Sequence, residues 1–242
     1  MDKQVVENAV KELKANSPKR NFKQSVDLII NLKDINLKNA DEQVNIFVTL
    51  AHETGRKFSA CALVGPEMQE KAKAAFDEVI LVDDFERFKN KKDIKQLAER
   101  HSYFIAQANI MAKIATAFGR VFGPRGKMPN PKVGAVIPPN VNVEPLYEKL
   151  KKTLHIVTKN DPSVRCLVGK EDMADTILID NILTVYNSVL QKLPNEQNNI
   201  KSVMIKTTMG HPIEMSHTQK AEAATEGKKK GKKVEIKAKK EQ

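Results

Sequence analysis

The stretch ACALVGPEMQEKAKAAFDEVILV, residues 60–82, decides the fold. It places two short apolar runs, ACALV at 60–64 and EVILV at 78–82, on either side of a segment suited to a helix. A third run, YFIA at 103–106, follows another helical stretch. Short continuous apolar strands that alternate with helices are typical of βαβ units, because strands of a parallel sheet are buried on both faces. We therefore predict an α/β domain with a parallel sheet in the middle of the chain.

Both ends of the chain have a different pattern. Residues 2–14 repeat apolar side chains at three-to-four spacing, as one face of a helix does. Val26, Leu28 and Ile30 alternate with polar neighbours, which predicts a strand with one buried face. The simplest layout is an α+β domain made from both chain ends and interrupted by the α/β domain. The other predicted elements of the ends are strands at 43–50, 154–159, 164–170 and 200–210 and a helix at 174–193.

The chain is basic throughout. Its 242 residues carry a formal net charge of +11. Residues 217–242 hold nine Lys and four Glu, which leaves +6 on the remainder. Such an excess attracts polyanions, so RNA or DNA is the expected partner, although a solubilising charge is the alternative. The terminal stretch 217–242 has no apolar period; we expect it to be disordered and to add nonspecific phosphate affinity.

Several classes of protein are disfavoured by the composition. Cys61 and Cys166 lie far apart in apolar runs, which predicts buried, reduced thiols. The five histidines lack zinc-ligand spacing. The start of the chain does not have the pattern of a signal peptide, and no apolar run approaches the roughly 18 residues of a membrane span. We predict a cytoplasmic protein with no metal, cofactor or membrane.

Catalysis has one candidate site. No G-x-x-x-x-G-K-[ST] phosphate loop occurs, and no G-x-G follows a strand of the middle segment. Asp83 and Asp84 follow the strand EVILV, where an α/β enzyme can place magnesium ligands, but the same position is typical of a helix N-cap. An α/β enzyme that acts on a nucleotide or RNA is therefore the rival hypothesis, and a DNA-packaging protein is a third.

A loop rich in Gly and Pro, residues 123–132, is a candidate phosphate-contact surface. Three Pro stiffen it, and two Gly permit close approach of a backbone. Arg125, Lys127 and Lys132 have no acidic residue near them in the sequence. The loop is either a rigid cationic contact surface or a structural cap of the sheet.

Two further segments suit contact with RNA. Residues 206–210, KTTMG, end a strand with two hydroxyl groups, a flexible thioether and a Gly, all able to lie against ribose or backbone. Phe22 lies among Lys19, Arg20 and Lys23, so its ring could lie against ribose or base. Taken alone, a phenylalanine at this position is more often a core residue.

These segments together carry a resemblance. Phe22 ahead of SVDLIINLKDI, the GPRGKMPNPKVGAV loop and the TTMG segment resemble the ribosomal protein L-one family of the large subunit, in its archaeal form, over residues 2–215. The resemblance implies an α/β fold of two domains. One is a discontinuous α+β (split β-α-β) domain from both chain ends, residues 1–64 plus 154–216, and the other is an inserted Rossmann-like α/β domain, residues 65–153. Residues 217–242 extend beyond both.

The resemblance also implies a function. The discontinuous domain is expected to bind rRNA of the mobile side stalk, and the protein to help release deacylated tRNA from the exit site and to repress translation of its own mRNA. It is expected to be a monomer within the large ribosomal subunit and not an enzyme. The rRNA-binding residues implied are Phe22, Lys23, Ser25, Lys170, Thr207, Thr208, Met209 and Gly210, with Arg125, Lys127 and Lys132 as a possible second RNA contact.

Overall fold

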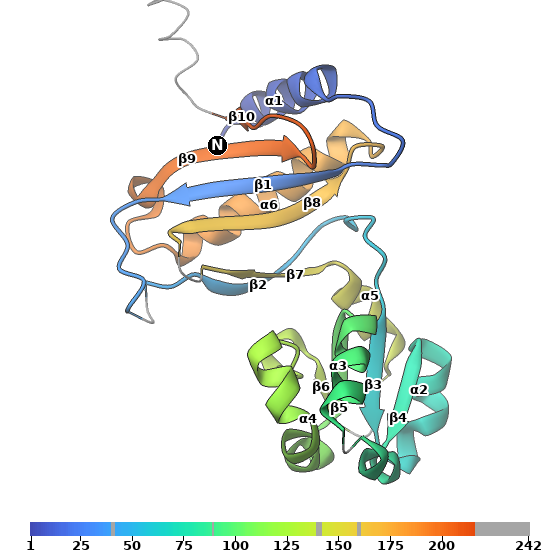
Figure 1. Cartoon of the computed structure of the whole chain (residues 1–242). Coiled ribbons are helices and arrows are strands. Elements are labelled where there is room, and N and C mark those ends of the chain that lie inside the picture. Colours follow the sequence, from blue (N-terminus) through green and yellow to red (C-terminus); the bar gives the residue numbers. More distant parts are fainter. Residues whose placement is uncertain (40–41, 89, 139–141, 159–160, 216–242) are drawn as a thin grey trace, which may run out of the picture. The chain divides into compact units, whose positions relative to one another are not determined.

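The computed structural model describes residues 1–39, 42–88, 90–138, 142–158 and 161–215 (Figure 1). The expected disorder of residues 217–242 therefore concerns residues outside the described ones. The chain forms two compact units. We call them the end unit, residues 1–44 together with the chain from Ile156 onward, and the middle unit, residues 45–155.

The boundaries between the two units differ from those expected from the sequence. The sequence places the boundaries after residue 64 and before residue 154, whereas the structure divides the chain after Val44 and before Ile156. Strand β2 (Asn45–Thr49) pairs with β7 (Thr153–Val157) in a separate two-stranded sheet. Because β2 does not join the larger sheet of the end unit, it falls on the other side of the boundary.

The end unit contains a four-stranded sheet in the order β10-β9-β1-β8 (Figure 1). Strand β1 (Ser25–Leu32) pairs antiparallel with β8 (Ser163–Lys170) on one side and with β9 (Ile200–Thr207) on the other. Strands β8 and β9 therefore run in the same direction and are connected by helix α6 (Asp175–Lys192). This is the split β-α-β arrangement that the resemblance implies. A short strand, β10 (Ile213–Glu214), completes the edge.

One face of this sheet is covered by α6 and by α1 (Lys3–Asn16), which also pack against each other. Alternate residues of β1 are buried, as the sequence predicts, and Leu28 is fully buried. The contact between sheet and helix is close at Gly169, where a Cβ would lie 2.5 Å from the side chain of Leu178 in α6. The helix predicted near the N-terminus is confirmed, with Asp2 at its N-cap position.

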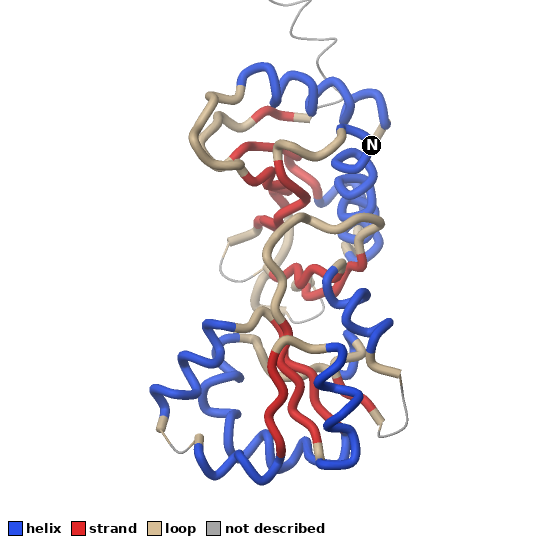
Figure 2. Tube along the Cα trace, turned by 90° about the vertical axis from the view of Figure 1, so that its right-hand side faces the viewer, coloured by secondary structure: helices blue, strands red, loops and turns tan. Residues whose placement is uncertain are grey.

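The middle unit contains a parallel sheet in the order β4-β3-β5-β6, with helices on both sides (Figure 2). Cys61 and Leu63 of β3 face one hydrophobic cluster, and Ala62 faces the other, so the sheet is buried on both faces. The α/β prediction for this segment is confirmed. The strands of the parallel sheet are β3 (Ala60–Val64), β4 (Glu78–Leu81), β5 (Tyr103–Gln107) and β6 (Val136–Ile137). The α-helices of the middle unit are α2 (Gln69–Ala75), α3 (Lys91–Arg100), α4 (Met111–Arg125) and α5 (Glu144–Lys151).

The two cysteines are free thiols. Cys61 is buried as predicted, whereas Cys166 is only half-buried. It lies on β8, one of the two edge strands of the end unit's sheet, where fewer neighbours cover it.

We expect Leu28→Ala to lower the free energy of unfolding of the end unit by about 2–5 kcal/mol, because it leaves a cavity between the central strand and the helices. Urea unfolding followed by circular dichroism measures the change. Ile29→Ala is the matched control, since Ile29 is half-buried on the opposite face of β1 and its loss should be smaller. Equal losses would contradict the assignment of the two faces.

Candidate nucleic-acid interface

One end of the sheet in the end unit brings together the start of one strand and the ends of two others. Ser25 begins β1, Lys170 ends β8 and Thr207 ends β9. Ser25 is paired with Lys170, and Thr207 is paired with Val26, the neighbour of Ser25. The antiparallel register therefore gathers residues that are far apart in the sequence. We call this the strand-end surface; its residues are Phe22, Lys23, Ser25, Lys170, Thr207, Thr208, Met209 and Gly210.

Two large apolar side chains of this surface face solvent. Phe22 is 52% exposed and Met209 is 56% exposed. Within the described part of the chain, these are the two large apolar side chains that stand exposed. The interpretation of Phe22 as a core residue is therefore wrong, because the ring lies in the loop before β1 and outside the packed face. Their position beside the same strand ends makes both side chains candidates for contact with a partner.

Thr208 extends the pairing of β1 with β9 beyond the strand itself. Its amide donates to the Ser25 carbonyl at 3.0 Å. The Ser25 amide donates to the Thr208 hydroxyl oxygen, also at 3.0 Å. The Thr208 hydroxyl therefore contributes to the fold as well as to the surface, because the two hydrogen bonds hold the backbone of Thr208 against that of Ser25.

Thr207 and Gly210 form the turn that carries Met209. Thr207 is buried, and its hydroxyl oxygen accepts a hydrogen bond from Ser17 Oγ at 3.3 Å. The Gly210 amide donates to the Thr207 carbonyl at 3.2 Å. A Cβ at Gly210 would lie 2.2 Å from Thr207 Oγ1, so the turn itself requires glycine at this position.

Gln24 is a residue of this region that the sequence analysis does not single out. Its side chain is fully buried and accepts a hydrogen bond from the Met209 amide at 3.1 Å. Its backbone carbonyl accepts one from Glu171 at 3.0 Å. A signal was available, because Gln24 is in phase with the buried alternate residues of β1 that begin with Val26.

The charge of the surface is mixed. Lys23 Nζ lies 2.6 Å from a carboxylate oxygen of Asp172, and this hydrogen bond lowers the pKa of the Asp172 carboxyl. One oxygen of Glu171 is buried and has no hydrogen-bond partner among the described residues. Lys19 and Arg20 are exposed nearby in sequence. The acids Glu171 and Asp172 therefore offset part of the positive charge that the sequence attributes to this region.

The loop at 123–132 differs from its prediction. Residues 123–125 form the last turn of α4, which ends at Arg125 and is followed by Gly126 as its C-cap, with a left-handed backbone (φ +66°). Arg125 forms an ion pair with Glu99 of α3 at 3.0 Å. The prediction that Arg125 lacks an acidic partner is therefore wrong, because α3 brings Glu99 to it from far along the chain.

Lys127 also belongs to the fold. Its ammonium group donates to the backbone carbonyls of Ala98 and His101, at 2.5 and 2.7 Å, at the C-terminus of α3. Cations stabilise helix C-termini in this way. Burial of the ammonium group lowers the pKa of Lys127, and the positive charges of Arg125 and Arg56 lower it further. Lys132 remains exposed and forms no ion pair with another described residue, so it is the cation of this loop that can reach a phosphate.

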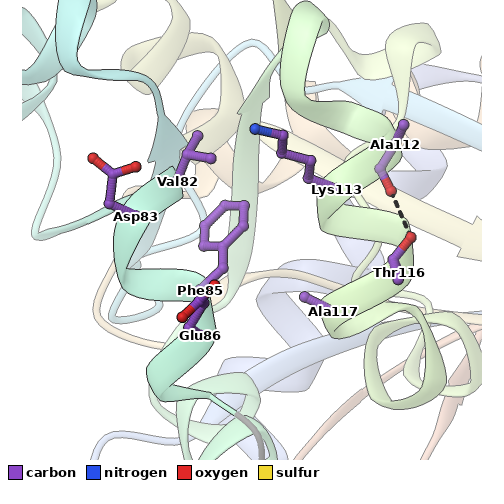
Figure 3. A pocket seen from close by; sticks show the side chains of 8 residues that line it. All are labelled: Val82, Asp83, Phe85, Glu86, Ala112, Lys113, Thr116 and Ala117. Carbon is purple, nitrogen blue, oxygen red and sulfur yellow. Dashed lines mark hydrogen bonds between the residues drawn. The ribbon is translucent and has the colours of Figure 1, made fainter.

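Asp83 and Asp84 lie in the first turn of a 3-10 helix, Val82–Arg87, whose N-cap position is Leu81. The interpretation of these aspartates as N-caps is therefore wrong, because both lie inside the helix and Leu81 occupies the N-cap position. Asp84 forms an ion pair with Arg87 at 3.0 Å. Asp83 lines an open cavity of about 740 Å³ between this helix and α4, but its carboxylate points away from α4 (Figure 3). Among the described residues, no three His, Cys, Asp or Glu side chains are placed to hold a metal ion together.

Across the described segments, no helix has both the length and the apolar character that a membrane span requires.

A basic chain with two α/β units, whose strand-end surface exposes an aromatic ring and a thioether beside lysines, has the features of an RNA-binding protein. Comparison with known proteins makes this class specific. A model of the ribosomal protein L1p/L10e family matches residues 11–211.

The relatives agree with this match. The chain is 39% identical to large ribosomal subunit protein uL1 of Thermococcus kodakarensis over 216 residues, which covers 88% of this chain and 98% of the relative. It is 40% identical to the same-named protein of Pyrococcus horikoshii over 214 residues, with 88% and 95% covered. For Methanothermococcus thermolithotrophicus the identity is 38% over 216 residues, with 89% and 99% covered. The chain belongs to the ribosomal protein L1p/L10e family.

Family membership confirms the resemblance drawn from the three sequence segments, and it confirms the two-domain α/β fold. It also makes the chain a cytoplasmic ribosomal protein, for which rRNA binding and a part in translation follow from the family.

We expect Lys127→Met to lower the free energy of unfolding of the middle unit by about 1–2 kcal/mol, because two carbonyls at the end of α3 lose a charged donor. Thermal or urea unfolding measures the change. Lys132→Met is the matched control in the same loop; it should change stability by less than about 0.5 kcal/mol and weaken only the salt-sensitive part of RNA binding. A stability loss at residue 132 and none at 127 would refute these roles.

Proposed function

We propose that this chain is a structural protein of the large ribosomal subunit that binds rRNA of the mobile side stalk through its strand-end surface. The observation that carries the proposal is the convergence of Phe22 and Met209, both exposed, at the end of three paired strands. The names of the archaeal relatives, all large-subunit proteins, support the assignment to that subunit.

The chemistry of the surface suits folded RNA. An aromatic ring can lie against a ribose or an unstacked base, and this contact does not depend on a base sequence. Lys170 can neutralise a phosphate, and the exposed Lys23 can exchange its ion pair with Asp172 for one with a phosphate, while backbone groups contact ribose 2′-hydroxyls. Recognition of this kind reads the shape of a bent RNA helix and requires no bond to be made or broken. We therefore propose a protein without catalytic activity, metal or cofactor, present as a monomer within the ribosome.

Two further activities belong to the proposal. An mRNA segment that copies the rRNA site would occupy the same surface, so free protein could repress translation of its own message. Deacylated tRNA at the exit site would meet a second contact, for which Lys132 is the remaining candidate, because Arg125 and Lys127 are held by α3. Both activities are implied by the family resemblance, and the exposed Lys132 supports the second.

We expect Phe22→Ala to weaken binding of stalk rRNA by about 1–3 kcal/mol without a measurable loss of fold stability, because the ring lies outside the core. Thr208→Val should weaken binding too and should also lower the free energy of unfolding by about 1 kcal/mol, since its hydroxyl accepts a hydrogen bond from Ser25. Filter binding and urea unfolding on the same preparations separate the two effects. Unchanged affinity for both variants would remove the site from this surface.

The proposal is tested by binding of the full chain to a stalk rRNA fragment and to an unrelated hairpin of equal length, at moderate and high salt. Charge-driven binding fades with salt, whereas recognition of shape keeps its preference. We expect the preference for stalk RNA to survive high salt. Equal binding of both RNAs that collapses with salt would contradict it.

The same preparation also tests the two alternative functions, a DNA-packaging protein and an α/β enzyme that acts on a nucleotide or RNA. Length-matched duplex DNA that binds as well as the stalk RNA would favour a DNA-packaging protein. A nucleotide with magnesium that raises the melting temperature would favour the enzyme, because a ligand of the folded state must stabilise it.

A further inference from the structure

Gln24 is a polar side chain buried where the strand-end surface meets the core. It is 0% exposed, and both the nitrogen and the oxygen of its side-chain amide make hydrogen bonds. Its Nε2 donates to Ser17 Oγ at 3.0 Å and to the Pro18 carbonyl at 2.9 Å. Its Oε1 accepts from the Met209 amide at 3.1 Å. A buried amide with all these bonds made is rigid, because breaking one leaves a polar group unsatisfied.

These bonds join three segments that are distant in the sequence. The side chain holds the segment after α1 and the turn after β9, and the Gln24 carbonyl holds the turn after β8 through Glu171. The same segments carry the strand-end surface: Phe22 follows the first, Met209 lies in the second and Lys170 precedes the third. In addition to the strand pairing, one residue therefore makes hydrogen bonds in or beside all three parts of the surface.

The Met209 side chain is mostly exposed, so the body of the protein holds this residue through its backbone. A surface that is fixed before binding loses less conformational freedom when the partner arrives, and this raises affinity without an added contact.

We propose that Gln24 is the positioning residue of the RNA-binding surface: it does not touch RNA, and it sets the geometry in which Met209 and Phe22 do. This inference rests on the proposed function, since it requires the surface to bind RNA.

A matched control lies at the opposite end of the same sheet. Asn199 is also a buried amide, 1% exposed. Its Nδ2 donates to the carbonyls of Lys33 and Asp34 at 3.1 and 3.3 Å, and its Oδ1 accepts from the Asn195 amide at 2.8 Å. Strand β9 separates it from the strand-end surface by roughly 26 Å, at about 3.3 Å per residue. A loss of amide bonds there destabilises the fold without moving the surface.

The first measurement compares Gln24→Met and Asn199→Leu, in the full chain, for unfolding and for the dissociation rate from the stalk rRNA fragment. We expect both variants to lose stability. Gln24→Met should bind about tenfold more weakly, mostly through faster dissociation, and Asn199→Leu should bind within about twofold of the unchanged protein. Equal affinities of the two variants, at conditions where both are folded, would overturn the inference.

A double-mutant cycle with Met209→Ala supplies a readout that a purely structural role would not move. If Gln24 acts through Met209, then Gln24→Met should cost much less affinity in the Met209→Ala background than in the unchanged protein. The same cost in both backgrounds would overturn the inference.

Ser17→Ala keeps the test decisive if Gln24→Met fails to fold. It removes one acceptor of the Gln24 amide, together with the hydrogen bond that Ser17 donates to Thr207, and leaves the Gln24 bonds to Pro18 and Met209 in place. We expect a severalfold loss of affinity, and an unchanged affinity would count against the inference. Failure of the unchanged protein to prefer stalk RNA would instead refute the proposed function, so the two failures are distinguishable.

Discussion

The antiparallel pairing of β1 with both β8 and β9 is the constraint on which the rest of the end unit depends. Strand β1 precedes the middle unit in the sequence, whereas its two partners follow it. The sheet can form only if the chain leaves the end unit and returns close to the same place. The pairing of β2 with β7 satisfies this condition, since it holds the outgoing and returning segments side by side. A large insertion then costs the end unit little closure entropy, because the ends of the insertion are already together.

The strands of both units could be predicted because their burial follows from the sequence pattern. Leu28 and its alternate neighbours mark the one covered face of β1, and the continuous apolar run at 60–64 marks a strand covered on both faces. The end of α4 could not be predicted in this way. Pro124 suggests a loop, yet the helix continues to Arg125 because Val121 and Phe122 pack into the core and hold the last turn. Packing there outweighs the local preference of proline.

The candidate site was predictable in its residue types and not in its contacts. Exposure of Phe22 depends on which side of the sheet the loop before β1 takes, and local sequence does not determine this. The roles of Arg125 and Lys127 depend on the C-terminal end of α3, whose contacting residues lie 26 residues earlier in the chain. A cation that looks free in sequence can be a helix cap in space, and only the tertiary structure separates the two.

At the strand-end surface the usual distribution of side chains is inverted. The polar Gln24 and Thr207 lie inside, and the apolar Phe22 and Met209 lie outside. The buried groups are tolerated because each has its hydrogen bonds, in part through the shared Ser17 hydroxyl. The exposed groups lose stabilisation that burial would have supplied, at about 25 cal/mol per Å² of apolar area. That free energy is recovered when a partner covers them. Because the buried hydrogen bonds already fix the surface, little of it is spent on reordering the protein.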